Sequence, residues 1–279
     1  MNERYDLHCH STASDGTLSP TLLVQRAQQQ GVTRLALTDH DTIDGLAEAQ
    51  EAAGAAGITL IPGIELSTTW ENRCFHIVGL NVNPRYHPLL DGCRKIQSIR
   101  IERAEKMARK LEKKRITGAF EAVKQAAGGG MITRTHFADF LLSQNYVSTQ
   151  QEAFDRYIGN GKPAYVSTTW TSLDEAVAWI TGAGGVAVLA HPLRYKLTAS
   201  WMKRLLSAFK QAGGLGIEVV YGRNNPADID SAADYARRFE LAASVGSDFH
   251  SPQNPWIELG RLNPLPPDLP PVWHFFSNI

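Results

Sequence analysis

Histidine and carboxylate side chains form short clusters near the ends of apolar segments of this chain. The first cluster pairs His8 with His10, and the last pairs Asp248 with His250. Because side chains alternate along a strand, residues two positions apart point to the same side and can offer two ligands to one cation. Further candidates of the same residue types lie between these pairs, namely Asp15, His40, Glu65, His76 and His191. Mixed imidazole and carboxylate ligands suit Zn, Mn or Fe, so the pattern predicts a site for divalent metal ions.

The number of candidate ligands predicts more than one ion. Imidazoles and carboxylates crowded at one place would be costly to desolvate, and divalent ions are the simplest compensation. Nine candidate ligands are more than one ion can take, which indicates two or three ions. The cysteines Cys9, Cys74 and Cys93 show no metal-binding spacing, and we expect them to be free thiols in a reducing compartment. Without a cysteine ligand, a purely structural zinc site is disfavoured.

Strand and helix patterns alternate along most of the chain and must position these side chains. Strands are predicted at residues 5–9, 34–38, 58–65, 75–82, 186–190, 216–221 and 241–245. Helices are predicted after Ser19–Pro20, after the capping box that begins at Ser172, and at residues 43–56, 201–212 and 226–238. This alternation implies a parallel sheet, and the number of repeats favours a closed α/β barrel. In such a barrel the strands end on one face, where the candidate ligands would converge.

One stretch interrupts the alternation. No strand pattern is found from about residue 94 to 163, and residues 94–115 hold ten of the 28 basic residues. Their apolar spacing predicts a helix with one packed and one cationic face, although a solvated face with i,i+4 pairs is an alternative. A run of glycines at 128–130 precedes a second helical segment. We interpret 94–163 as a mainly helical insertion, a lid, between barrel segments 1–93 and 164–279.

Composition excludes several classes of protein. The 279 residues carry 28 basic and 28 acidic side chains, so a surface built entirely to bind polyanions is not expected, although a local basic patch is allowed. No apolar run is long enough for a membrane span, and the first residues lack the apolar core of a signal peptide. We therefore expect a cytoplasmic globular protein with no membrane association, and nothing indicates a protein partner. The proline-rich residues 263–272 are expected to lie over the surface as extended chain.

Five motifs, in order along the chain, resemble those of the PHP (polymerase and histidinol phosphatase) superfamily. They are His8-x-His10 with Asp15-Gly16, Thr38-Asp39-His40-Asp41, Gly63-Ile64-Glu65, Ala190-His191-Pro192 and Gly246-Ser247-Asp248-Phe249-His250. Within the superfamily, further segments resemble the group of nucleoside 3',5'-bisphosphate phosphatases and RNase AM, a 5'-3' exoribonuclease. These segments are residues 6–16, 99–111, 134–137, 161–166 and 255–261. The resemblance spans nearly the whole chain.

The resemblance implies a distorted seven-stranded (β/α) barrel with a helical lid and a centre of three metal ions, usually manganese. One ion would be held by His8, His10, Glu65 and Asp248. A second would be held by Glu65, His76 and His191, and a third by Asp15, His40 and His250. A hydroxide that bridges two ions would be the nucleophile, because shared coordination lowers the pKa of water. We expect Asp39 and Asp41 to orient His40 or a neighbouring ligand, with caps at a helix start as the alternative.

Residues of the predicted insertion would bind the rest of the substrate. Arginine suits forked contacts with phosphate, so we expect Arg103 and Arg134 to hold the phosphate that is not cleaved. His136 is a candidate proton donor to the leaving oxygen. Further substrate-binding candidates are Arg100, Thr135 and Lys162. The alternative for Arg103 is ordinary surface charge, and the alternative for Lys162 is a linker residue.

The leading functional hypothesis is a metal-dependent phosphohydrolase. It would remove the 3'-phosphate of nucleoside 3',5'-bisphosphates, for example converting adenosine 3',5'-bisphosphate to AMP. It would also trim short 5'-monophosphorylated RNA or oligonucleotides in the 5' to 3' direction. One alternative is a histidinol phosphate phosphatase. An alternative from another class is a non-catalytic, metal-containing nucleic-acid-binding module that contacts RNA through residues 94–115.

Overall fold

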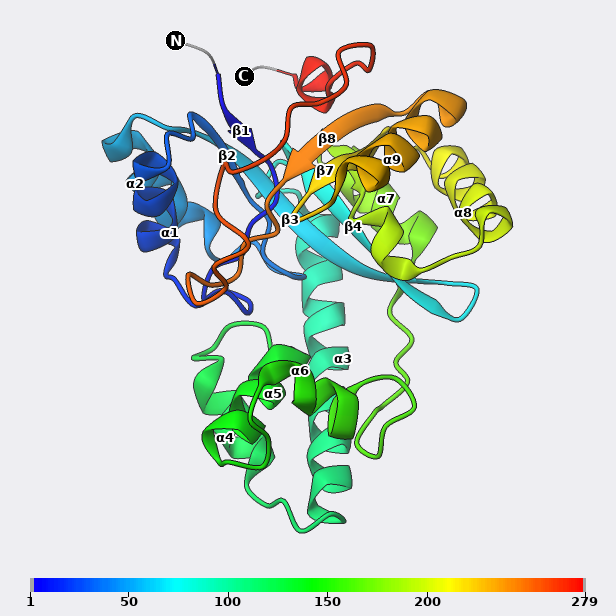
Figure 1. Cartoon of the computed structure of the whole chain (residues 1–279). Coiled ribbons are helices and arrows are strands. Elements are labelled where there is room, and N and C mark those ends of the chain that lie inside the picture. The colour runs from blue at the N-terminus through cyan, green and yellow to red at the C-terminus, as the bar shows by residue number, and fades with distance from the viewer. Residues whose placement is uncertain (1–2, 278–279) are drawn as a thin grey trace.

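Seven strands form a nearly closed barrel in the computed structural model, which describes residues 3–277. Around the barrel their order is β1 (Tyr5–Asp6), β2 (Arg34–Leu37), β3 (Thr59–Trp70), β4 (Arg73–Leu80), β6 (Val186–Leu189), β7 (Gly216–Tyr221) and β8 (Ala242–Gly246). The first and last strands meet at a seam, where the Leu7 amide donates to the Val245 carbonyl at 3.0 Å. The predicted seven-stranded α/β barrel with a helical insertion is confirmed (Figure 1).

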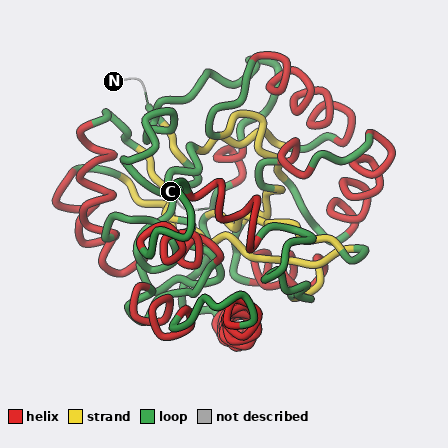
Figure 2. The backbone as a smooth tube through the Cα atoms, turned by 60° about the horizontal axis from the view of Figure 1, so that its bottom comes forward, coloured by secondary structure: helices red, strands yellow, loops and turns green. Residues whose placement is uncertain are grey.

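Helices surround the strands (Figure 2). Those outside the insertion are α1 (Pro20–Gln29), α2 (Leu46–Ala56), α7 (Leu173–Gly182), α8 (Ala199–Gln211) and α9 (Pro226–Phe239). Two predicted N-termini are confirmed by their caps. The Ser19 side chain accepts from the Leu22 amide, and Ser172 forms a reciprocal capping box with Glu175. The helix predicted at 43–56 begins three residues later than expected, at Leu46.

The fourth strand departs from the expected parallel sheet. After β3 the chain turns back through Glu71 and Asn72, whose φ angles of 45° and 60° allow a two-residue hairpin. Strand β4 is therefore antiparallel to both β3 and β6, and the expectation of a parallel sheet is wrong at this strand. An antiparallel strand begins on the face where its parallel neighbours end. His76, near the start of β4, consequently reaches the same face as the other candidate ligands.

The insertion is helical, as predicted, and has its own apolar core. It contains α3 (His87–Glu112), α4 (Ala119–Ala126), α5 (Arg134–Ser143), α6 (Gln150–Ala153) and a π-helical turn (Phe154–Ile158). Its core includes Met107, Leu111, Val123, Phe137 and Leu141. We call residues 94–163 the lid. The predicted boundary at residue 94 falls inside α3, which leaves the barrel as one continuous helix (Figure 1), so the division into segments stays a prediction.

The lid is attached to the barrel at several points. The first half of α3 packs on α7, where Gly92 lies directly against the Trp179 ring. After the glycine run, the Met131 amide donates to the Ala13 carbonyl at 3.0 Å. The returning chain forms β5 (Thr171–Ser172), which pairs with β3. These contacts fix the lid beside the mouth of the barrel.

The proline-rich segment at 263–272 has no helix up to residue 271, as expected, and runs along the barrel, while its last residue begins a 3-10 turn. The Ala243 amide of β8 donates to the Pro270 carbonyl at 2.8 Å. A final 3-10 turn (Val272–Phe275) places the Trp273 ring on Tyr5, with ring centroids 3.9 Å apart. The three cysteines are free, as predicted. Within residues 3–277 there is no helix with the length and apolar character needed to cross a membrane.

The contact between Gly92 and Trp179 makes the lid attachment testable. A Cβ at position 92 would lie 2.5 Å from the Trp179 ring, so Gly92→Ala should overpack this contact and lower the free energy of unfolding by about 1–3 kcal/mol. Gly54→Ala is the matched control, because Gly54 lies within α2 with nothing within 4 Å of its Cβ position. That change should raise stability by about 0.5–1 kcal/mol. Urea denaturation measures the free energy of unfolding of both variants. An equal change in the two variants would contradict the close contact between Gly92 and Trp179.

Candidate metal centre

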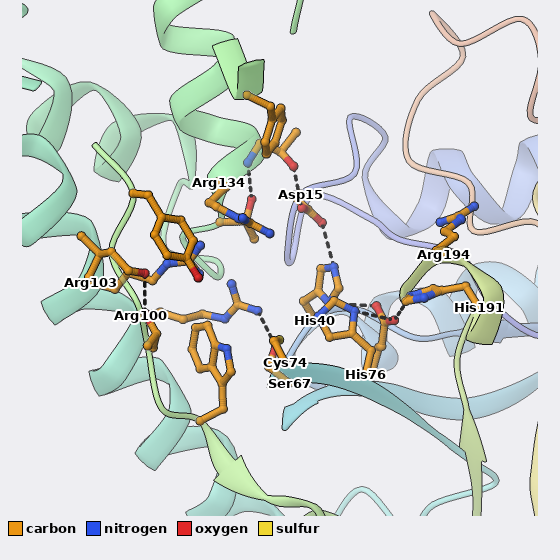
Figure 3. A pocket seen from close by; sticks show the side chains of 18 of the residues that line it. Asp15, His40, Ser67, Cys74, His76, Arg100, Arg103, Arg134, His191 and Arg194 are labelled. Carbon is orange, nitrogen blue, oxygen red and sulfur yellow. Dashed lines mark hydrogen bonds and ion pairs between the residues drawn. The ribbon is translucent and has the colours of Figure 1, made fainter. Parts of the chain in front are cut away.

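The carboxylate of Glu65 is the centre of the site. It lies on β3 and is fully buried. Its Oε2 lies 2.8 Å from His40 Nδ1, and its Oε1 lies 3.0 Å from His76 Nδ1. Three more imidazole nitrogens lie within 3.4 Å of the carboxylate, those of His8, His10 and His191. Five imidazoles therefore converge on one acidic group. Figure 3 shows three of them, those of His40, His76 and His191.

Two further carboxylates flank this group. Asp248 Oδ1 lies 3.3 Å from His10 Nε2 and 3.4 Å from His8 Nε2. Asp15 Oδ1 lies 3.4 Å from His250 Nε2 and 4.0 Å from His40 Nε2. All nine side chains predicted as ligands are thus gathered on one face of the barrel.

The donor set fits divalent cations. Ligand atoms within 4.8 Å of one another fall into three groups: His10, Asp15, His40 and His250; His8, His10 and Glu65; and His40, Glu65 and His76. Two buried carboxylate oxygens, Asp15 Oδ1 and Glu65 Oε2, have no hydrogen-bond donor. His40 Nδ1 lies close to Glu65 Oε2, but not in the geometry of a hydrogen bond. Buried acceptors without a partner are rare and costly, and bound cations in these groups would satisfy each oxygen.

Electrostatics keeps the carboxylates ionised. Burial alone would raise the pKa of Glu65, but the surrounding imidazoles, led by His40 and His76, hold it well below its usual range. The pKa of Asp248 is likewise held low against burial, mainly by Arg194 and His8. Burial opposes protonation of His250, yet Asp15 raises its pKa to about 9. Binding of cations here would release such protons from the imidazoles.

Two aspartates beside His40 act on other groups than expected. Asp39 accepts from the Ser11 amide at 2.7 Å and from the Ser14 hydroxyl at 2.6 Å. Asp41 accepts from the Ser67 amide at 2.6 Å and forms an ion pair with Arg100. Neither carboxylate has a hydrogen bond to the ring of His40 or of another candidate ligand, so that expectation is corrected. Neither caps α2, whose N-cap is Gly45. These carboxylates fix the loops that carry the ligands, and Asp41 also links the barrel to the lid.

Glu218 is a functional residue that sequence reasoning missed. It is buried on β7, where Oε1 accepts from His8 Nδ1 at 2.7 Å and Oε2 accepts from the His191 amide at 2.6 Å. His191 has φ 30°, a costly conformation for a residue other than glycine, and Glu218 helps to hold it. A charged residue inside a predicted buried strand was the available signal.

Arg194 was also missed. It follows His191 closely, forms an ion pair with Asp248 Oδ2, and lines the cavity. Figure 3 shows it on the far side of the histidines from Arg103 and Arg134. Its place a few residues after a predicted ligand at a strand end was a usable signal.

A cavity of about 340 Å³ lies between the metal-ligand cluster and the lid. Arg103 and Arg134 line it, with their guanidinium carbons 5.2 Å from the Trp170 ring and 5.7 Å from the Phe154 ring. Burial and the charges of neighbouring arginines lower the pKa of Arg103 to about 9, and its Nε has no hydrogen-bond partner. Neither Arg103 nor Arg134 has a carboxylate partner within residues 3–277, whereas Arg109 on the same helix pairs with Glu105.

The other predicted substrate residues have different surroundings. Arg100 lines the cavity, but it is buried and its charge is already paired with Asp41. Thr135 also lines the cavity and donates its hydroxyl to Asp15 Oδ2 at 3.0 Å. His136 is not on the cavity wall, because its Nδ1 accepts from the Thr133 amide in the cap of α5. Lys162 is exposed and also outside the wall. The geometry therefore gives no support to His136 as proton donor or to Lys162 as a substrate contact.

Solved structures share this fold. An amidohydrolase from Chromobacterium violaceum, with bound sulfate and no metal, has a TM-score of 0.92 and 43% identity over 97% of this chain and 95% of its own. A protein from Bifidobacterium adolescentis, assigned as a metal-dependent phosphoesterase, has a TM-score of 0.83 and 28% identity over 100% of this chain and 98% of its own.

Comparisons of sequence agree with those of structure. A 5'-3' exoribonuclease from Haemophilus influenzae is 47% identical over 99% of this chain and 100% of its own length. A 3',5'-nucleoside bisphosphate phosphatase from Chromobacterium violaceum is 44% identical over 96% of this chain and 94% of its own length. The PHP domain family matches residues 6–221. Since that match covers most of the chain and carries four of the five predicted motifs, the chain belongs to the PHP domain family.

Proposed function

We propose that this chain is a metal-dependent phosphohydrolase with one bond-breaking activity on two kinds of substrate. It removes the 3'-phosphate of nucleoside 3',5'-bisphosphates, and it shortens 5'-monophosphorylated RNA from the 5' end. In RNA the same 3'-phosphate is esterified to the next nucleotide, so only the leaving group differs. Relatives named as an exoribonuclease and as a bisphosphate phosphatase support a single site with both activities.

One observation carries the proposal, which is that two arginines without carboxylate partners face a cluster of metal ligands across one cavity. Arg103 and Arg134 are partly withdrawn from water, and a phosphate is the anion that their forked donors fit best. The ligand cluster around Glu65 is suited to a second phosphate. A substrate with two phosphates on one nucleoside matches this arrangement.

In this proposal the ligand cluster binds the cations, and the lid arginines position the substrate. When bound, divalent cations would activate water and neutralise charge on the phosphoryl oxygens. Glu65, Asp15 and Asp248 with the six imidazoles would hold those cations. Arg103 and Arg134 would fix the 5'-phosphate, which sets the distance to the cleaved bond. Substrates that lack this phosphate would lose the contacts with both arginines and bind more weakly.

The finer assignments belong to the same proposal. We infer three cations, with manganese preferred, held in the sets that the PHP resemblance implies. The three groups of ligand atoms support more than one cation. The preference for manganese and the division into three sets rest on the PHP resemblance. We also infer a cytoplasmic enzyme, in keeping with nucleotide substrates and free thiols.

The alternatives fit the cavity less well. Histidinol phosphate carries one phosphate and a cationic amine, and the amine would meet Arg103 and Arg134 with no carboxylate to offset the repulsion. A non-catalytic RNA-binding module would not need donor-free carboxylate oxygens such as those of Asp15 and Glu65 beside the cavity.

The arginines make the 5'-phosphate requirement testable. Arg103→Ala and Arg134→Ala should each lower kcat/KM for 5'-phosphorylated substrates by roughly 10- to 100-fold, the value of a charge-assisted contact. Activity on 5'-hydroxyl RNA should change little, because that substrate makes no such contact. Arg109→Ala on the outer face of α3 is the control. Equal activity of the unchanged enzyme on both RNAs would refute this role.

Removal of the central carboxylate should empty the metal centre. Glu65→Gln removes the negative charge that several imidazoles share, so the purified variant should carry less metal per chain and lose hydrolytic activity. Elemental analysis and the rise of Tm on addition of manganese measure this directly. Glu105→Gln on the exposed face of α3 is the control. A Glu65 variant with unchanged metal content would contradict the centre.

Glu218 should act as a positioning residue for the ligands. Glu218→Gln replaces one acceptor oxygen with an NH2 group, which is a donor. The variant side chain therefore cannot accept from both His8 Nδ1 and the His191 amide. Loss of an outer contact of this type costs roughly 10- to 100-fold in metal affinity. Metal titration should show this loss, and saturating metal should restore much of the activity. Unchanged affinity would show that the carboxylate does not position the ligands.

A further inference from the structure

An exposed aromatic side chain lies beside a cation at the rim of the barrel. Trp256 has 64% of its surface exposed, and the Arg223 guanidinium carbon lies 4.2 Å from the centroid of its ring. Trp256 belongs to the loop after β8, and Arg223 belongs to the turn after β7. Arg223 has no carboxylate partner among the described residues. We call this pair the Trp256–Arg223 platform.

The turn that carries Arg223 lies next to Arg194, a residue of the metal site. Arg194 forms an ion pair with Asp248, one of the candidate ligands. The Arg194 guanidinium also lies against the turn after β7. A Cβ added at Gly222 in that turn would lie 2.6 Å from Arg194 NH2. Gly222 directly precedes Arg223. Asp248, Arg194, the turn at Gly222 and the Trp256–Arg223 platform are therefore neighbours in sequence or in space.

The direction of an RNA substrate places its next nucleotide on this side. Arg103 and Arg134 lie on one side of the histidine cluster and Arg194 lies on the other (Figure 3). With the 5'-phosphate at the lid arginines and the cleaved phosphodiester at the metal centre, an RNA chain that continues in the same direction passes on the side of Arg194. A nucleoside bisphosphate ends at the metal centre and has nothing to place there.

The chemistry of the platform suits single-stranded RNA. An exposed indole ring offers a stacking surface to any base, and a guanidinium adds cation–π and phosphate contacts. Such sites tolerate every sequence, as an enzyme that shortens RNA stepwise requires. Arg223 has no carboxylate partner among the described residues, so its charge favours a polyanionic ligand over an apolar one.

We propose that the Trp256–Arg223 platform binds the RNA downstream of the cleaved bond, with a base stacked on Trp256. This inference rests on the proposed function, because it takes the 5'-phosphate to lie at the lid. It assigns a separate subsite to RNA that the bisphosphate does not use. RNA shortening therefore depends on one surface that hydrolysis of the bisphosphate does not use.

The test compares two substrates in one variant. Trp256→Ala should lower kcat/KM for a 5'-phosphorylated oligoribonucleotide of several nucleotides by about tenfold, which corresponds to about 1.4 kcal/mol and lies within the range for stacking of one base. Hydrolysis of adenosine 3',5'-bisphosphate should not change. Trp256→Phe should keep most of the RNA activity, because it keeps an aromatic face.

The control is another exposed aromatic residue. Phe275 is 46% exposed in the turn at the C-terminal end, away from the lid (Figure 1), and Phe275→Ala should leave both activities unchanged. An equal loss on both substrates, or no loss on RNA, for Trp256→Ala would overturn the platform.

A direct binding measurement separates this inference from the proposed function. Fluorescence anisotropy with a labelled 5'-phosphorylated oligoribonucleotide, without added metal, should show weaker binding by Trp256→Ala than by the unchanged protein. If the unchanged protein hydrolyses neither substrate, the proposed function fails, and this measurement still tests the platform. Equal binding by both proteins would then overturn the platform as well.

Discussion

The burial of three carboxylates at one end of the barrel is the constraint on which the rest of the structure depends. Glu65 has almost no exposed surface, and Asp15 and Asp248 are nearly as buried. Ionised groups in such a place are stable only when opposite charges or cations surround them. Arg194 and protonated imidazoles such as that of His250, whose pKa is raised to about 9, supply part of that compensation. The strand ends, the loops after them and the lid are arranged so that these groups meet.

Three residues at the metal face have strained backbone conformations. Asp41, His191 and Asp248 have φ angles of 56°, 30° and 54°, which residues other than glycine adopt at a cost of about 1–3 kcal/mol each. All three lie just beyond the end of a strand at the metal face. Buried hydrogen bonds hold them there, such as that from the His191 amide to Glu218. These conformations direct His191 and Asp248 toward the metal centre, and Asp41 toward Ser67 and Arg100.

How much the sequence predicts depends on the range of the interaction. The i,i+2 pair of His8 and His10 is local, so strand periodicity alone places both imidazoles on one side. The outer contacts are not local. Asp41 pairs with Arg100, 59 positions away, and Glu218 with His8, 210 positions away. No local pattern specifies such partners, which is why Asp41 was assigned to the wrong neighbour and Glu218 was missed.

The same reasoning explains the mixed outcome in the lid. Composition shows that α3 is basic, but it does not show which cations are already paired. Arg100 and Arg103 are three positions apart on one helix, yet Arg100 is neutralised by Asp41 and Arg103 has no carboxylate partner in the described chain. A half-buried cation without a carboxylate partner has lost part of its hydration, and an incoming phosphate can replace it. The unpaired state of Arg103 is therefore the stronger indication of substrate binding, and only the fold reveals it.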